Sequence, residues 1–163
     1  MNSVETIKNT IQTADMVCNA YLDDLTDADL MKRPHPKCNH LNWQVGHLIA
    51  SDNMMANGCF PGTLPALPEG FEEKYSKETT GNDDASAFHT KAELMEIFKK
   101  QRELVVSKLD QLSESDLDKP APESMQAYAP NVGAALNMLG SHWLMHAGQW
   151  VIVRRELGRE IVI

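Results

Sequence analysis

The sequence has few of the features that mark membrane or secreted proteins. Among its 163 residues, no apolar run approaches the roughly 20 residues that a membrane-spanning helix requires. Its three cysteines, Cys18, Cys38 and Cys59, are an odd number without a disulfide pattern, so reduced thiols are the simplest interpretation. Residues 1–7 have neither a basic start nor an apolar core, so we expect no signal peptide. These absences predict a cytoplasmic protein with no membrane partner.

An excess of basic charge is also lacking. The sequence has 15 lysines and arginines against 23 aspartates and glutamates, and its formal net charge is −8. Because a general nucleic-acid binder needs a basic surface to meet phosphate, we expect no nucleic-acid partner. The hydrophobic fraction of 42% is enough for a complete core, and the length suits one domain over residues 1–163.

Four stretches have apolar residues three or four positions apart, the spacing of amphipathic helices. We expect Ser3 to cap the first helix, and Thr90 with Glu93 to form a capping box at the start of the third. Asn131 is the expected cap of the fourth helix, and Gly158 is placed to end it. The pattern therefore predicts an all-α fold, a single four-helix bundle.

The predicted second helix, from about Leu41 to Asn57, is apolar on two sides. One stripe consists of Leu41, Val45, Leu48 and Met55. The other, almost opposite, consists of Trp43, His47, Ala50 and Met54. A helix with two apolar stripes should pack on two sides, so His47 can face a different neighbour from Leu48.

A faint internal repeat relates the two halves of the chain. Residues 25–30 (LTDADL) follow the first helix and residues 112–117 (LSESDL) follow the third, and a proline comes soon after each. Common helix punctuation accounts for such a likeness; the alternative is a pair of related helical hairpins around a pseudo-twofold axis. In the second case helices two and four lie together, and His47 can meet His142 and His146.

The connection between the second and third helices, from Gly58 to His89, is long and rich in proline, glycine and polar residues. Connections of this length are uncommon in compact domains unless they are functional or disordered. This one is long enough for the third helix to run parallel to the second. We therefore predict up-down-down-up topology.

Two histidines four residues apart, His142 and His146, lie on one face of the predicted fourth helix. At this spacing both imidazoles can bind one divalent metal at about 2.0–2.1 Å. Their stripe is apolar, and a buried polar group without a partner costs roughly 1–3 kcal/mol, which a shared metal would remove. His47 would complete a three-histidine site with an open coordination position, the arrangement of catalytic rather than structural metal sites.

A structural role is the competing interpretation, because a lone histidine on an apolar face is usually a core residue with a hydrogen bond. Classical zinc-protease chemistry is disfavoured, since its motif needs Glu directly after the first histidine and this sequence has Trp143 there. His35 and His40 resemble loop residues, and His89 is expected to be solvated. Three histidines suit zinc, nickel, cobalt, copper or ferrous iron, of which we expect zinc or nickel.

The motifs around these histidines resemble those of the DinB-like superfamily. They are residues 43–48 (WQVGHL), 142–149 (HWLMHAGQ) and 154–158 (RRELG), and the resemblance covers nearly the whole chain. It implies a four-helix bundle of up-down-down-up topology, with a metal triad that falls here on His47, His142 and His146. It also implies a homodimer, which members of the superfamily often form.

The resemblance further implies a metal-dependent enzyme, since characterised members include metal-dependent thiol transferases. Our leading hypothesis is a thiol S-transferase, in which the metal lowers the pKa of a low-molecular-weight thiol that attacks an electrophilic small-molecule substrate. A metal-dependent hydrolase and a non-catalytic metal-binding stress-response protein are the alternatives. The catalytic base is unknown, because Asp52 falls on the other stripe of its helix. The candidate substrate-binding residues are Trp43, Met54, Met138 and Trp150.

Overall fold

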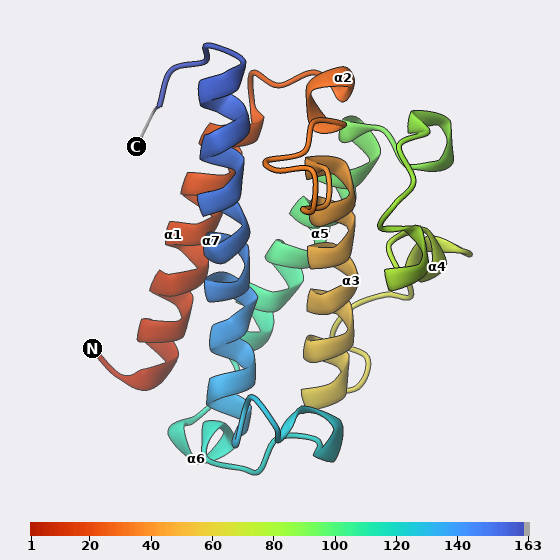
Figure 1. The fold of residues 1–163 in the computed structure, drawn as a ribbon. Helices are drawn as coiled ribbons and strands as arrows, with labels where there is room; N and C mark the ends of the chain where they lie inside the picture. Colours follow the sequence, from red (N-terminus) through yellow and green to blue (C-terminus); the bar gives the residue numbers. More distant parts are fainter. Residues whose placement is uncertain (162–163) are drawn as a thin grey trace.

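The structure, a computed structural model, describes residues 1–161, and among these it contains helices and turns but no strand. Four long helices form a bundle: α1 (Ser3–Leu22), α3 (Leu41–Cys59), α5 (Lys91–Leu109) and α7 (Val132–Glu156). Helices α1 and α7 run in one direction, and α3 and α5 run in the other (Figure 1). The predicted all-α bundle of up-down-down-up topology is therefore confirmed.

The start of α1 differs by one residue from the prediction. Asn2, rather than Ser3, is the cap, because its side-chain oxygen accepts a hydrogen bond from the backbone N–H of Glu5 at 2.9 Å. The Glu5 carboxylate returns a bond to the Asn2 N–H, which completes a capping box. Ser3 is the first helical residue, and its N–H donates to Glu114 at 2.8 Å.

The other predicted helix caps are confirmed, whereas α3 continues two residues beyond the expected Asn57, to Cys59. Thr90 and Glu93 form the capping box of α5, and the side chain of Asn131 accepts a hydrogen bond from the N–H of Ala134 at the start of α7. Gly158 follows the end of α7 with a φ of 66°, a left-handed conformation that glycine adopts without steric cost.

The internal repeat has a structural counterpart. The single-turn helices α2 (Asp27–Leu30) and α6 (Glu114–Leu117) occupy equivalent places after α1 and α5. Each begins with a capping box between a Thr or Ser and an Asp three residues later. The second link also contains the short 3₁₀ helix η3 (Glu123–Met125). As the hairpin hypothesis requires, α3 and α7 pack side by side (Figure 1).

The long connection between α3 and α5 is folded against the bundle. It contains the single-turn helix α4 (Phe71–Lys74) and two short 3₁₀ helices, η1 (Lys77–Thr79) and η2 (Ala85–Ala87). Its Tyr75 ring packs on Gly46 of α3, where a Cβ atom would lie 2.2 Å from the ring. Only glycine permits this contact, which fixes the connection against α3.

His89 belongs to this packed connection and is not solvated as predicted. Its ring stacks on Phe71 with centroids 4.9 Å apart, and its backbone N–H donates to the hydroxyl of Tyr75 at 3.1 Å. No local pattern indicates this partner, because Tyr75 is fourteen residues away in a segment without clear periodicity.

Helix α7 packs closely against α1, and it also packs against α3. At Gly140 of α7 an added Cβ would lie 2.8 Å from the backbone carbonyl of Thr10 in α1, so the two helices meet backbone to backbone. Within residues 1–161, none of the helices combines the length and the apolar character needed to cross a membrane.

Candidate metal centre

Helices α3 and α7 bring the three predicted metal ligands together. The candidate ligand atoms of His47, His142 and His146 all lie within 4.8 Å of one another. The ring centroids are 5.0 Å apart for His142 and His146, 5.4 Å for His47 and His142, and 5.9 Å for His47 and His146. All three side chains are half-buried. We call these residues the histidine triad; metal binding by the triad stays a prediction.

The triad is neutral at physiological pH. Burial, and then the nearby His47 ring, lower the pKa of His142 to about 4. Burial, and then the other two rings, lower the pKa of His146 to about 4, and burial alone lowers the pKa of His47. Neutral imidazoles offer the lone pairs that a metal ion needs, so the group is suited to a cation without prior loss of protons.

Gln44 of α3 fixes the ring of His146. Its amide nitrogen donates to the backbone carbonyl of Asn39 at 2.7 Å, which leaves its oxygen as the acceptor facing α7. That oxygen lies 2.8 Å from Nδ1 of His146 and also accepts the indole N–H of Trp150 at 2.9 Å. Nδ1 of His146 therefore carries the proton, and Nε2 keeps its lone pair for a metal. Gln44 was not among the residues predicted from the sequence, although it stands three residues before His47.

His142, unlike His146, has no hydrogen-bond partner for its Nδ1 atom among the described residues, and this atom is buried. An orphaned polar atom of this kind costs free energy unless a bound group satisfies it. The triad thus offers three neutral nitrogen donors. Gln44 orients the ring of His146, and a nitrogen of His142 is unsatisfied. A divalent transition metal fits such a set.

Trp43 covers one side of the triad. Its ring stacks on His47 with centroids 5.0 Å apart and an interplanar angle of 11°. The indole N–H donates to the hydroxyl of Thr79 at 2.9 Å and lies 3.3 Å from the carbonyl of Ser76. The long connection therefore anchors a side chain that contacts a triad histidine.

The sequence model of the DinB superfamily matches residues 10–150. This chain belongs to the DinB superfamily. Its motif residue Arg154 is fully buried and donates to the carbonyl of Tyr21 at 2.7 Å, so in this DinB-superfamily chain it ties the end of α7 to the end of α1. No curated protein sequence matches the chain.

Two solved structures share the fold of this DinB-superfamily chain. A conserved protein from Enterococcus faecalis superposes with a TM-score of 0.70 at 19% identity, over 98% of this chain and 99% of its own. YfiT from Bacillus subtilis superposes with a TM-score of 0.62 at 13% identity, over 96% of this chain and 89% of its own. YfiT is described as a probable metal-dependent hydrolase with an unusual four-helix bundle topology.

The predicted substrate-binding residues lie in different environments. Trp43 contacts the triad through His47, whereas Trp150 is fully buried and is bonded to Gln44. Met54 is 49% exposed on α3, and Met138 is partly buried on α7. Their role in substrate binding stays a prediction, as does the homodimer.

A second polar cluster, which was not predicted from the sequence, lies in the core of this DinB-superfamily fold. Arg102 of α5 lies 2.8 Å from a carboxylate oxygen of Asp15 and 3.1 Å from one of Asp52, and it donates to the carbonyl of Leu139 at 2.6 Å. Asp52 also accepts the indole N–H of Trp143 at 2.8 Å. Burial raises the pKa of Asp52 to about 7, although Arg102 and then Trp143 lower it. We call Asp15, Asp52 and Arg102 the carboxylate–arginine cluster.

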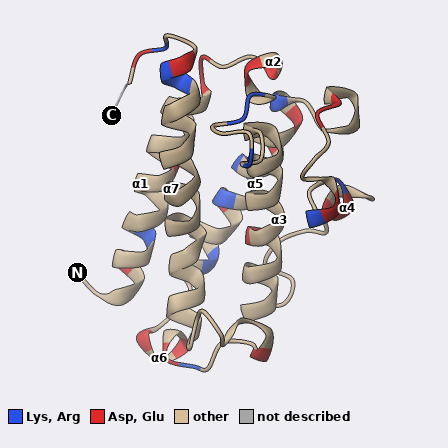
Figure 2. Ribbon diagram, in the orientation of Figure 1, with Lys and Arg blue, Asp and Glu red and all other residues tan. Residues whose placement is uncertain are grey.

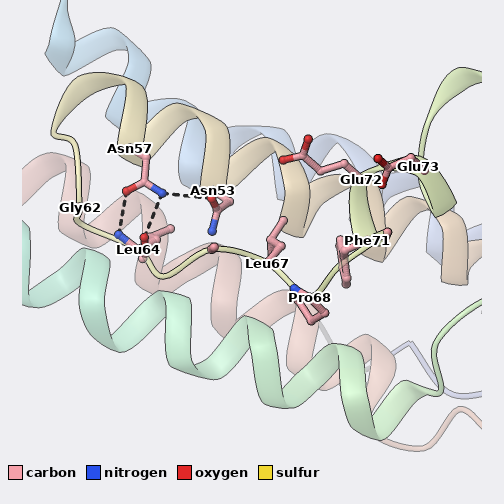
Figure 3. Close-up of a pocket in the computed structure, with 11 residues that line it drawn as sticks. Asn53, Asn57, Gly62, Leu64, Leu67, Pro68, Phe71, Glu72 and Glu73 are labelled. Atoms are coloured by element: carbon pink, nitrogen blue, oxygen red, sulfur yellow. Dashed lines mark hydrogen bonds between the residues drawn. The ribbon is translucent and has the colours of Figure 1, made fainter.

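A cavity of about 490 Å³ lies between α3 and residues 62–73, and no triad histidine lines it. Asn57 binds both backbone groups of Leu64 and contacts Asn53 (Figure 3). These asparagines are thus occupied in holding the connection on α3. Asn53 is six positions from His47, which on a helix of about 3.6 residues per turn places this cavity away from the triad.

Proposed function

We propose that this chain is a metal-dependent enzyme that transfers a low-molecular-weight thiol to an electrophilic small molecule. The observation that carries the proposal is a group of three neutral histidines, without a carboxylate or cysteine, where α3 meets α7. His47, His142 and His146 would hold a divalent transition metal, zinc or nickel. When bound, such a metal supplies an open coordination position and lowers the pKa of a thiol.

The chain's own residues prepare the site for this chemistry. Gln44 holds the His146 ring in one orientation and one tautomer, with Nε2 unprotonated. Trp43 covers a face of His47 and restricts the approach of water on that side. Because the pKa of each triad histidine is lowered, the rings bring lone pairs rather than protons to the site near pH 7.

Thiol transfer suits the surroundings of the triad better than hydrolysis does. In thiol transfer the sulfur bonds to carbon, the leaving group departs with its electron pair, and the thiol proton passes to solvent. Hydrolysis of an amide also needs an acid to protonate the leaving nitrogen. Gln44 and Trp43, which contact the triad, offer an amide and an indole, and neither is such an acid. The carboxylate of Asp52 is committed to Arg102 and Trp143.

Conjugation of thiols to monochlorobimane tests the proposal. The protein is loaded with zinc or nickel, its metal content is measured, and formation of the fluorescent thioether is followed with and without low-molecular-weight thiols. We expect conjugation that depends on both metal and thiol. His142→Ala should lower it by about 100-fold or more, because one ligand is lost. His35→Ala is the matched control, since His35 is an exposed loop residue that should leave the rate unchanged.

Two outcomes contradict the proposal. If neither zinc nor nickel binds, every metal-dependent function fails. If metal binds but no thiol supports conjugation, thiol transfer fails, and a metal-induced rise in melting temperature without any turnover would favour the non-catalytic alternative.

A metal-dependent hydrolase is the second candidate, favoured by the similarity in fold to YfiT and its description. Hydrolysis of p-nitrophenyl acetate, with metal and without thiol, separates it from thiol transfer. Ester cleavage that His142→Ala abolishes and that thiols do not accelerate would support the hydrolase.

A further inference from the structure

His40, expected from the sequence to be a loop residue, is fully buried and immediately precedes the first turn of α3. Its Nδ1 atom accepts a hydrogen bond from the backbone N–H of Trp43 at 3.0 Å. Its backbone carbonyl accepts the N–H of Gln44 at 3.1 Å. The imidazole is therefore the N-cap of α3, at a position that Ser, Thr, Asp or Asn usually occupies.

Both ring nitrogens of His40 are in use. Because Nδ1 accepts a hydrogen bond from Trp43, the proton of the neutral ring lies on Nε2, which donates to the carbonyl of Asn82 at 3.2 Å. The ring also meets the ring of Phe88 edge-on, with centroids 4.8 Å apart. Asn82 and Phe88 belong to the long connection, so this connection holds in place the ring that caps α3.

The surroundings of His40 keep its ring neutral. Burial, and then the charge of Arg33, lower the pKa of His40, whereas smaller contributions from Asn82 and Asp83 raise it. Figure 2 shows a basic loop above the start of α3, and the first turn of α3 contains no acidic side chain. Since an acidic residue in the first turn would otherwise help to stabilise the N–H groups there, the start of α3 depends on the neutral ring of His40.

The two residues that His40 holds are the ones whose side chains support the triad. Trp43 stacks on His47 with ring centroids 5.0 Å apart, and the oxygen of Gln44 lies 2.8 Å from Nδ1 of His146. Without its cap, the first turn of α3 would fray, because the first N–H groups of a helix have no partner within the helix. Fraying would disturb both supporting contacts together.

We propose that His40 is a positioning residue of the candidate metal centre. As the N-cap of α3 it fixes Trp43 and Gln44, and through them it sets the orientation of two triad rings. The effect on metal affinity rests on the proposed function. The effect on the ring of His146 does not, because it can be measured in the metal-free protein.

The tautomer of His146 tests the inference without metal. Long-range ¹H–¹⁵N correlation spectra near neutral pH report which imidazole nitrogen carries the proton. We expect the Nδ1–H tautomer alone in the unmodified protein, and a mixture of both tautomers in His40→Ala, because Gln44 is no longer held. His40→Asn supplies a side-chain oxygen that can accept the Trp43 N–H, so it should restore the single tautomer.

Thr90→Ala is the matched control for a lost cap. Thr90 caps α5, where its side chain accepts a hydrogen bond from the N–H of Glu93, and α5 carries no triad histidine. The substitution removes a capping bond of the same kind and should lower the melting temperature. It should leave the tautomer of His146 unchanged.

Zinc affinity, measured by competition with a chelator, tests the effect on the complete site. We expect His40→Ala to weaken zinc binding by about tenfold or more, and His40→Asn and Thr90→Ala to stay within about threefold of the unmodified protein. His40→Asn also lacks the bond to Asn82, so it should melt at a lower temperature while it retains zinc affinity. A residue with only a structural role would not separate these two measurements.

The outcomes distinguish this inference from the proposed function. If neither zinc nor nickel binds the unmodified protein, the proposed function fails, and the tautomer of His146 still decides the inference. A single tautomer in His40→Ala would overturn the inference while the proposed function stands. Zinc affinities that fall in all three variants in proportion to their melting temperatures would show a structural role only, and would also overturn it.

Discussion

Two polar clusters contact α7, and they differ in charge. In the carboxylate–arginine cluster the charge of Arg102 is placed between Asp15 and Asp52, and Trp143 donates a further hydrogen bond. In the histidine triad the rings are neutral. Each cluster has a buried atom without a hydrogen-bond partner in the described part of the chain, Oδ1 of Asp52 in the first and Nδ1 of His142 in the second. The carboxylate–arginine cluster joins α1, α3 and α5, and we call it closed because its opposite charges are paired within the protein. We call the triad open because its rings are neutral and retain lone pairs.

The largest expected effect comes from opening the closed cluster. Arg102→Leu removes the cation and leaves the buried Asp52 and the half-buried Asp15 without a counter-charge, so the free energy of unfolding should fall by about 3–5 kcal/mol. Urea denaturation of the metal-free protein at pH 8 measures this loss.

Adding Asp15→Asn and Asp52→Asn to the arginine variant is the control. Because the control removes both uncompensated charges, it should recover much of the lost stability. A loss below about 1 kcal/mol in Arg102→Leu would show that the cluster does not hold the helices together.

The two clusters should also respond to pH with opposite signs. Burial lowers the pKa of His142 and His146 to about 4, below the ordinary value of 6.5, so the unfolded chain binds protons first as the pH falls. Stability from the triad is complete above about pH 6.5 and is lost between about pH 6.5 and 4. The loss for this pair should be about 2–3 kcal/mol, after allowance for the partial exposure of the rings.

Asp52 acts in the other direction. Its pKa is raised from 3.8 to about 7, so its contribution to stability is greatest at low pH and is lost as the pH rises from about 4 to about 7. Denaturation of metal-free variants across this range separates the two effects. Relative to the unmodified protein, His142→Gln/His146→Gln should gain stability as the pH falls, and Asp52→Asn should lose it. Parallel curves for both variants would contradict the contrast between the clusters.

Gln44 makes a side-chain hydrogen bond to the triad, through Nδ1 of His146. Its loss should lower metal affinity more than it lowers the free energy of unfolding. Gln44→Met leaves Nδ1 of His146 without its acceptor, so zinc affinity should fall by about 10–100-fold. Competition with a zinc chelator measures the affinity. Gln149→Met is the control, since the oxygen of Gln149 accepts a hydrogen bond from the amide nitrogen of Gln44 at 3.2 Å and not from a histidine. This substitution should change the zinc affinity less than about threefold. Equal losses in both variants would argue against a specific role for Gln44.

The grouping of the triad histidines could be predicted from the sequence because helical spacing determines which residues share a face. His142 and His146 share a face at any bundle angle, and the second apolar stripe of α3 turns His47 toward a different neighbour from Leu48. The repeat at residues 25–30 and 112–117 then indicated which two long helices meet.

The contacts around the triad could not be predicted, because they join residues that no local pattern relates. The amide of Gln44 is oriented by the carbonyl of Asn39, a backbone atom, before its oxygen can face His146. Arg102 lies one turn beyond Phe98 on the apolar stripe of α5, and this polar interruption was the available signal for a buried charge. Its partners come from two other helices, so only the folded chain identifies them.

The smallest expected effect concerns the anchor of Trp43. Trp43→Phe keeps an aromatic ring beside His47 but removes the hydrogen bond to Thr79, so stability should fall by about 1 kcal/mol while zinc affinity changes less than about twofold. Hydrogen exchange at residues 76–80 should become faster, because that segment loses its attachment to α3. Trp43→Ala also removes the stacked ring, and it should weaken zinc binding further. Zinc affinity lowered equally by Trp43→Phe and by Trp43→Ala would contradict this prediction. The hydrogen bond to Thr79, rather than the stacked ring, would then position His47. The triad would in that case depend on the long connection, as the carboxylate–arginine cluster depends on Arg102.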